Sequence, residues 1–145
     1  MDTAILGVGN ILMKDDGVGV HVARALSGLD LPDGVVVIDA GTDPDVAYDV
    51  DRAARVIVVD AMRGDGPPGT MYRLTGADAA TSQERSCHDI ALLETLCLAR
   101  PAVRDLVVFG IEPKEIGCGL DLSPEVAATV PRVIERVREE VKARL

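Results

Sequence analysis

Aromatic residues are almost missing from this chain of 145 residues, which contains one Phe, two Tyr and no Trp. Because 48% of the residues are nevertheless apolar, the core has to be built from aliphatic side chains. Parallel sheets that are covered on both faces use aliphatic strands of this kind. The length suits one domain, which can bury a core without disulfides or a structural metal. We therefore expect a single domain over residues 1–145.

Clusters of basic residues are missing as well. Acidic side chains outnumber basic ones by 24 to 15, and the net charge is −9. Nucleic acid is not expected as a partner, because binding phosphates requires Lys and Arg, and anionic membranes would repel an acidic surface. The opening segment MDTAILGVGN has no basic start and only a short apolar run, so it predicts neither a signal peptide nor a membrane span. We expect a cytoplasmic protein.

Several catalytic and binding motifs are also absent. Cys87, Cys97 and Cys118 are odd in number and have no CxxC spacing, so reduced thiols are predicted rather than disulfides or a zinc site. The sequence Gly7-Val-Gly9 lacks the third Gly of a dinucleotide fingerprint, which disfavours a nucleotide-binding domain. No GxxxxGK[ST], HExxH or GxSxG motif occurs. These absences exclude the most familiar hydrolase and nucleotide-binding signatures.

Aliphatic runs are what the sequence does contain, and they predict five strands. The strands are expected at residues 4–8, 35–39, 56–60, 70–74 and 106–110. Helical patterns alternate with them and are expected from Gly17, over 45–52, over 90–98 and from Ser123. The alternation predicts an α/β fold, a three-layer α/β/α sandwich around a mostly parallel five-stranded sheet. The strand over 70–74 follows a turn rather than a crossover, so we expect an antiparallel edge strand beside its neighbour.

Two of the predicted helices have informative starts. Asp15 and Asp16 precede the first helix, where carboxylates are favoured by the unpaired N–H groups and the helix dipole. Ser123 is the expected cap of the last helix, and Pro124 stands at its first position. Pro131 interrupts the apolar stripe of that helix and is expected to kink it.

Candidate chemistry lies at strand ends, because parallel sheets bind ligands outside the carboxyl ends of their strands. Asp60 and Asp39 each close an apolar strand, and Asp16 lies in the loop after another. Each also has a structural reading as a cap or turn residue. His21 lies mid-helix and is expected to be a surface or packing residue. His88 precedes a predicted helix, and an imidazole joined by carboxylates can bind a divalent metal or transfer a proton.

Five segments in order resemble one family. The segment Leu6–Gly19, LGVGNILMKDDGVG, resembles the signature of the hydrogenase maturation peptidases. The DAGT loop from Asp39, the segment VVDAMRGDGPPGTMYRL from Val58 and the helix start at His88 also match. The last match is GIEPKEI followed by LSPEV, within Gly110–Val126. The resemblance covers essentially the whole chain.

This resemblance implies an endopeptidase that removes the C-terminal extension of the large subunit of a [NiFe]-hydrogenase after nickel insertion. It implies that Asp16, Asp60 and His88 recognise the nickel held by the substrate. No tightly bound cofactor is then expected, although Cd or Zn could substitute for nickel in a crystal. The expected partner is the precursor of the large subunit, and we expect a monomer. A nickel-checking chaperone that binds the precursor without cutting it is the alternative.

Some details depart from the family pattern. Asp16 stands where some members have Glu, so it reaches less far by about one methylene. The residue after His88 is Asp89, where Gln or Asn is frequent. The contexts DAGT-DPD and SCHDI resemble the branch that serves formate-linked or F420-reducing hydrogenases. Either Asp16 or Asp60 could be the general base, or a metal could polarise the scissile carbonyl. A weaker hypothesis is a substrate-reading loop formed by Asp39, Gly41 and Thr42.

Overall fold

The five predicted strands form one sheet in the computed structural model, which describes residues 2–43, 45, 50, 53–75 and 105–143. Their order across the sheet is β2-β1-β3-β5-β4, and every predicted end lies within two residues of the observed one. The strands are β1 (Thr3–Val8), β2 (Val35–Gly41), β3 (Arg55–Ala61), β4 (Met71–Thr75) and β5 (Asp105–Ile111). The helical elements are η1 (Lys14–Gly17), α1 (Val18–Ser27) and α5 (Pro124–Lys142).

The sheet is mixed, with one antiparallel strand. Strands β2, β1, β3 and β5 are parallel, and β4 pairs antiparallel with β5 at the edge. The antiparallel edge strand is thus confirmed, but its neighbour is β5 and not β3, the strand before it in the chain. The connection from β3 to β4 can step across β5, because two strand spacings measure only about 10 Å and nine extended residues reach about 30 Å.

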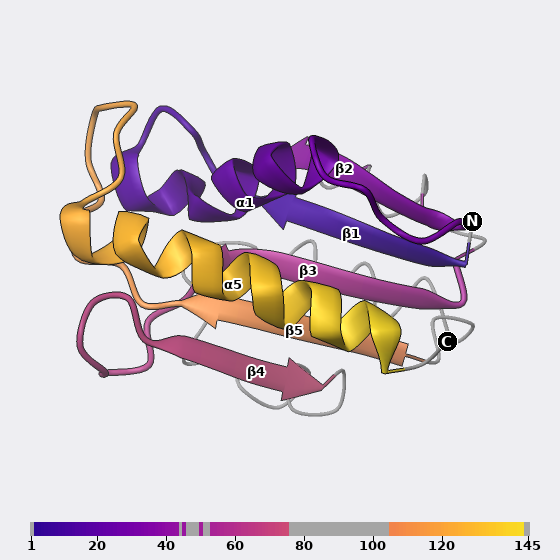
Figure 1. The fold of residues 1–145 in the computed structure, drawn as a ribbon. Coiled ribbons are helices and arrows are strands. Elements are labelled where there is room, and N and C mark those ends of the chain that lie inside the picture. Colours follow the sequence, from indigo (N-terminus) through magenta and orange to yellow (C-terminus); the bar gives the residue numbers. More distant parts are fainter. Residues whose placement is uncertain (1, 44, 46–49, 51–52, 76–104, 144–145) are drawn as a thin grey trace.

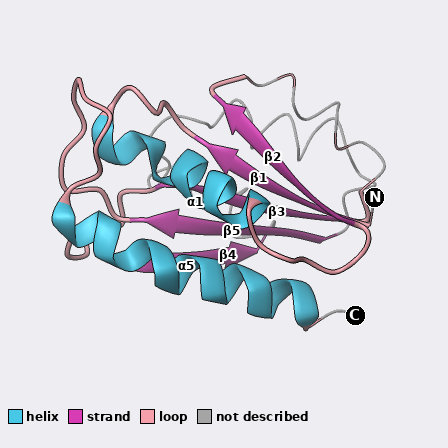
Figure 2. Ribbon diagram, turned by 45° about the horizontal axis from the view of Figure 1, so that its top comes forward, coloured by secondary structure: helices cyan, strands magenta, loops and turns pink. Residues whose placement is uncertain are grey.

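Both α1 and α5 pack on the same face of the sheet (Figure 1, Figure 2). Ile5, Ile57 and Phe109 point into this layer and are fully buried. The opposite face is buried too, as Leu6 and Val108 show. An α/β fold around an aliphatic core is therefore confirmed. The helices expected over residues 45–52 and 90–98 lie outside the described residues, except for positions 45 and 50.

Helix α1 lies directly against the backbone of two strands. A Cβ atom on Gly19 would overlap the carbonyl oxygen of Val59 on β3 and would also crowd that of Val8 on β1. A Cβ on Gly7 would overlap the Gly19 carbonyl from the other side. The close contact between α1 and the sheet therefore requires glycine at both positions. Because η1 lies just before α1 in the chain, this contact also holds η1 at the ends of β1 and β3.

The C-terminal helix α5 begins as the sequence predicts, with Ser123 at the N-cap position and Pro124 in the first turn. The Ser123 hydroxyl does not cap the helix, however, because it donates to the Asp15 carboxylate instead. The helix continues through Pro131, and a kink at that residue stays a prediction. No helix among the described residues is long and apolar enough to cross a membrane.

Candidate active site

Strands β1, β3 and β5 end at the same end of the sheet (Figure 1). Four buried carboxylates belong to η1, which lies beside these strand ends, and to the last residues of β3 and the residue after β5. We call this end of the sheet the rim. The four residues are Asp15, Asp16, Asp60 and Glu112, and none is more than 5% exposed. A buried charge is costly unless hydrogen bonds compensate it. The partners of each carboxylate therefore indicate what it does.

Asp15 binds η1 to the loop that precedes α5. Its carboxylate accepts hydrogen bonds from the N–H groups of Lys114, Glu115 and Ser123 and from the Ser123 hydroxyl, at 2.7–2.9 Å. Burial raises the pKa of Asp15, but these four bonds together lower it more, and the pKa lies below the ordinary value of 3.8. Asp15 is thus a structural carboxylate whose ionised form is stabilised by the fold.

Glu112 has a similar role on the other side of the rim. Its Oε1 accepts hydrogen bonds from the N–H groups of Gly64 and Gly66 and from the Tyr72 hydroxyl, at 2.8–3.0 Å. Burial raises the pKa of Glu112, but these bonds outweigh it and lower the pKa from 4.5. Glu112 was not predicted from the sequence. It directly follows β5, just as Asp60 lies near the end of β3, and this placement of a carboxylate at the end of an apolar strand could have identified it.

Asp16 and Asp60 both lie beside Gly9, the residue that follows β1. Asp16 Oδ2 accepts from the N–H of Asn10 at 2.9 Å, and Asp60 Oδ1 accepts from the N–H of Ala61 at 2.7 Å. Gly9 has a φ of +131°. A Cβ there would overlap the Asp16 carbonyl oxygen and lie 3.6 Å from Asp60 Oδ1. The structure thus brings Asp16 and Asp60 together, while their chemical roles stay a prediction.

The histidine predicted to join them, His88, lies outside the described residues. Within the described part of the chain, no group of three or more His, Cys, Asp or Glu is arranged to hold a metal ion. The set of Asp16, Asp60 and His88 therefore also stays a prediction. His21 lies in α1 and is half-buried, in line with a packing residue.

The predicted substrate loop reaches the rim through its backbone. The Gly41 carbonyl accepts a hydrogen bond from the Gly9 N–H at 2.8 Å. The Asp39 carboxylate instead pairs with Arg24 of α1 at 3.2 Å, with both side chains exposed, so the pair adds little stability. Thr42 is exposed. Of the three residues, Gly41 is the one bonded to Gly9.

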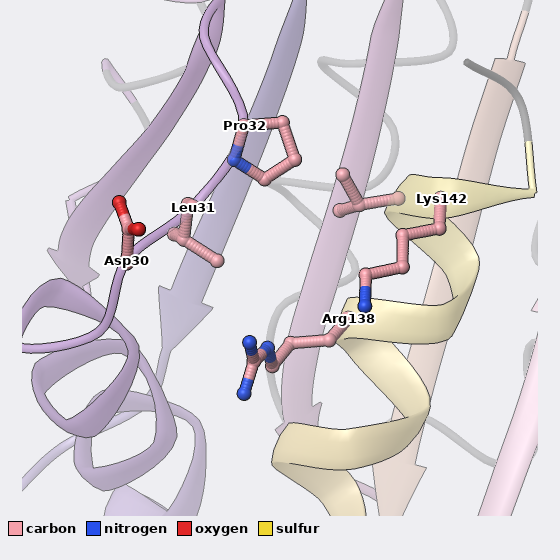
Figure 3. Close-up of a pocket in the computed structure, with 6 residues that line it drawn as sticks. Asp30, Leu31, Pro32, Arg138 and Lys142 are labelled. Atoms are coloured by element: carbon pink, nitrogen blue, oxygen red, sulfur yellow. The ribbon is translucent and has the colours of Figure 1, made fainter.

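Two hollows formed by described residues lie away from the rim. One of about 210 Å³ lies between α5 and the segment that leads into β2 (Figure 3). The other, of about 390 Å³, is lined by the C-terminal half of α5. That half of α5 contacts Arg55, the first residue of β3, so both hollows belong to the opposite end of the sheet.

Comparison with known proteins identifies the family. A family model described as hydrogenase maturation protease matches residues 20–140. The chain belongs to the hydrogenase maturation protease family. The protease is 31% identical to the coenzyme F420 hydrogenase subunit delta of Methanothermobacter thermautotrophicus, with 94% of this chain and 92% of the relative covered. It is 30% identical to the hydrogenase 2 maturation protease of Escherichia coli, over 94% and 88% of the two chains.

Solved structures agree with this assignment. The [NiFe] hydrogenase maturation protease HybD from Thermococcus kodakarensis superimposes with a TM-score of 0.83 at 29% identity. The alignment covers 97% of this protease and 99% of that chain. The resemblance read from the five sequence segments is confirmed, and the protein is a hydrolase of peptide bonds.

Proposed function

We propose that this protease removes the C-terminal extension of the large-subunit precursor of a [NiFe]-hydrogenase after nickel has been inserted. Family membership supports the class of reaction, and the likeness to a [NiFe] hydrogenase maturation protease supports the class of substrate. One observation carries the site. Asp15 and Glu112 accept hydrogen bonds from neighbouring loops, whereas Asp16 and Asp60 lie beside each other at Gly9.

The substrate's nickel is the proposed recognition element. Imidazole and carboxylate groups are suitable ligands for nickel(II), and Asp16, Asp60 and His88 supply two carboxylates and one imidazole. They would complete the coordination of a nickel ion that the precursor already holds, which places the scissile bond at the rim. The protease itself then needs no tightly bound cofactor, because the metal arrives with the substrate.

Hydrolysis requires a base at the same place. A water molecule adds to the scissile carbonyl carbon as a carboxylate of Asp16 or Asp60 accepts its proton, and the leaving nitrogen gains a proton as the C–N bond breaks. Nickel close to the carbonyl oxygen would polarise it. The rim is suited to this chemistry because the carboxylates of Asp16 and Asp60 are buried and each accepts a hydrogen bond from a backbone N–H group.

The test uses the nickel-loaded and the nickel-free precursor. We expect the wild-type protease to release the C-terminal peptide from the loaded form only, as read by mass spectrometry. Asp16→Asn, Asp60→Asn and His88→Ala should each lose cleavage, whereas the surface control Glu139→Gln should keep it. Cleavage by all three variants would refute the site assignment. Binding of the precursor by the wild type without any change in mass would instead indicate a non-catalytic chaperone.

The roles of the two carboxylates are separable by kinetics. Loss of the general base should lower kcat by about 10²- to 10⁴-fold with little change in KM. Loss of a nickel contact should raise KM for the loaded precursor and reduce the preference for it over the nickel-free form. Comparing Asp16→Asn with Asp60→Asn on both precursors therefore assigns the base.

The substrate is proposed to come from an F420-reducing or formate-linked hydrogenase. The 31% identity to a protein named coenzyme F420 hydrogenase subunit delta supports the first of these. The segment with Asp39, Gly41 and Thr42 is the proposed reader of the substrate's tail, since Gly41 is bonded to Gly9. Competition between the precursors of different hydrogenases tests the proposed class of substrate through the KM for each precursor. The same assay with Thr42→Ala alongside the wild type tests the proposed substrate-reading segment, again through KM.

A further inference from the structure

Two leucines at the rim are strongly exposed. Leu12 is 59% exposed and Leu120 is 61% exposed, more than any other large hydrophobic side chain among the described residues. They are 108 positions apart in the sequence, yet both lie in loops beside η1. Exposed apolar side chains that gather at one place commonly mark an interaction site.

The two loops are joined backbone to backbone. The N–H of Lys14 donates to the Gly119 carbonyl at 2.8 Å, and the N–H of Gly119 donates to the Leu12 carbonyl at 2.9 Å. Met13 and Gly119 form a parallel bridge between them. We call residues 10–14 and 115–121 together the strap. The bridge pairs Met13 with Gly119, and these are the chain neighbours of Leu12 and Leu120, so the strap displays both leucines from adjoining backbone segments.

The strap is also anchored to the core. The Asp15 carboxylate accepts the bonds from Lys114, Glu115 and Ser123 described above, and the N–H of Asp15 donates to the Glu115 carbonyl at 3.1 Å. Lys14 has a φ of +52°, a conformation that a residue with a side chain keeps only where its surroundings impose it. A surface held in this way loses little conformational entropy on binding.

The basic side chains beside the leucines are already paired. Lys14 contacts Glu115 at 2.5 Å, and Lys114 contacts Glu125 at 2.9 Å. Within each of these two ion pairs, the positive and the negative charge neutralise each other. The strap therefore offers a partner the apolar side chains of Leu12 and Leu120, with the exposed carboxylate of Asp121 next to Leu120 in the chain.

We propose that Leu12 and Leu120 form a docking surface for apolar side chains of the precursor next to its scissile bond, an inference that rests on the proposed function. The strap runs directly into η1, where Asp16 follows Lys14 by two positions. The N–H of Asn10, which belongs to the strap, also donates to Asp16 Oδ2 at 2.9 Å, so the strap borders the candidate site. Its continuity with the candidate site selects the precursor as the occupant.

The test is steady-state cleavage of the nickel-loaded precursor by Leu12→Ser, Leu120→Ser and the double variant. Each single substitution should raise KM by about tenfold, as expected for the loss of one buried leucine contact, with kcat unchanged. Leu29→Ser is the matched control, because Leu29 is also exposed, at 41%, but follows the far end of α1. It should leave both constants unchanged. The three leucines replaced in these four variants are all exposed, so the variants should fold, which a urea midpoint verifies.

Three results would overturn the docking surface. The first is a folded double variant whose KM equals that of the wild type, while the wild type cleaves normally. This result leaves the proposed function intact. The second is a fall in kcat with KM unchanged. The third result applies if the wild type cleaves no precursor, in which case the proposed function fails by itself.

Precursor binding is then measured directly by calorimetry. Equal affinity of the wild type and the double variant would overturn the docking surface, whereas an affinity weakened by about tenfold or more in the double variant supports it.

Discussion

At the scale of single residues, the rim shows how neighbouring carboxylates acquire different roles. Asp15 and Asp16 are adjacent in η1 and equally buried, yet their side chains point to different parts of the molecule. Asp15 accepts bonds from the loop before α5, while Asp16 accepts from Asn10 next to Gly9. One carboxylate stabilises the scaffold, and the other is placed at the proposed site.

The Asp15→Asn substitution should destabilise the protein by about 1–3 kcal/mol, because an amide cannot accept all the bonds that the carboxylate accepts. Since folding lowers the pKa of Asp15, its contribution is present above the unfolded-state pKa of about 4 and is lost as the pH falls through the folded-state pKa. The difference between wild type and variant should therefore shrink below about pH 4. Urea unfolding at pH 7 and pH 3 measures it.

Asp121→Asn is the control for this prediction, because Asp121 is an exposed carboxylate of the same loop. It should change the free energy of unfolding by less than about 0.5 kcal/mol. An Asp15→Asn variant with the wild-type urea midpoint at pH 7 would contradict the structural role of Asp15.

At the scale of elements, the contact between α1 and the sheet depends on the absence of a side chain. Gly19→Ala places a Cβ against the carbonyl oxygens of Val59 and Val8, which are backbone atoms that cannot move aside easily. We expect a loss of about 3 kcal/mol in the free energy of unfolding. Gly117→Ala is the matched control, since a Cβ there meets nothing within 4 Å. Equal stability of the two variants would show that α1 tolerates a shift away from the sheet.

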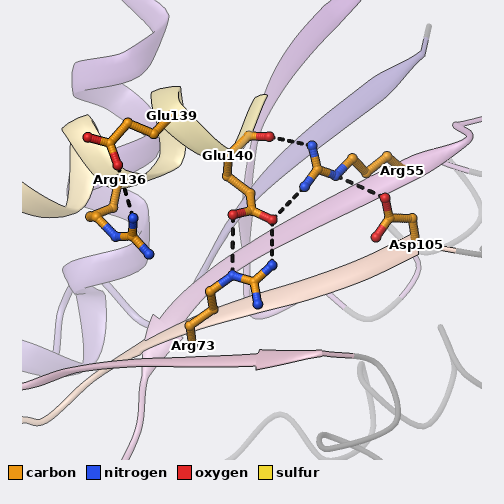
Figure 4. A network of polar contacts seen from close by, with 6 residues as sticks. All are labelled: Arg55, Arg73, Asp105, Arg136, Glu139 and Glu140. Carbon is orange, nitrogen blue, oxygen red and sulfur yellow. Dashed lines mark hydrogen bonds and ion pairs between the residues drawn. The ribbon is translucent and has the colours of Figure 1, made fainter. Parts of the chain in front are cut away.

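A second contact between elements holds the end of α5 at the amino ends of the strands (Figure 4). Arg55, at the start of β3, donates to the Glu140 carboxylate at 2.6 Å and pairs with Asp105 at 3.2 Å. Arg73 of β4 also donates to Glu140, at 2.7 Å. The hydrogen bond from Arg73 lowers the pKa of Glu140, burial opposes this, and the charges of Arg73 and Arg55 lower the pKa further. The helix is thus joined to β3 and β4 by charge-assisted bonds, and Arg55 also links β3 to Asp105 of β5.

The Glu140→Gln substitution should destabilise the protein by about 3 kcal/mol, because it removes a negative charge from beside the buried Arg55. Glu139→Gln is the matched control. Its carboxylate lies one position earlier in α5 and pairs with Arg136 at 2.9 Å, but both side chains are exposed. It should cost less than about 1 kcal/mol. Chemical denaturation of both variants measures the difference, and similar midpoints would contradict a special role for the buried network.

At the scale of the whole molecule, the two ends of the sheet have separate tasks. The rim carries the proposed site and the strap, whereas the amino ends of the strands carry the network around Arg55. We therefore expect Glu140→Gln to leave kcat and KM unchanged at temperatures where the variant remains folded. Cleavage assays at about 15 °C below its midpoint of thermal unfolding measure this. A loss of kcat in the folded variant would show that the two ends are coupled through α5.

The sequence by itself determined the five strands and the two helices α1 and α5. Aliphatic runs and the start of α5 at Ser123 and Pro124 were readable because strand and helix periodicities depend on near neighbours. The same holds for the family, whose five segments lie within short stretches. Asp16 and Asp60 could be assigned to one end of the sheet because parallel strands point the same way. The position of His88 stays a prediction that rests on the resemblance.

Tertiary structure alone decided which distant segments meet. It inserted β5 between β3 and β4, directed the Ser123 hydroxyl to Asp15, and brought Leu12 beside the loop of Leu120. The partners of Asp15 lie about a hundred positions away in the chain. A buried carboxylate takes its role from the donors that surround it, and local sequence does not specify donors so far away. That is why Asp15 and Glu112 became structural carboxylates, while Asp16 and Asp60 remained the candidates for chemistry.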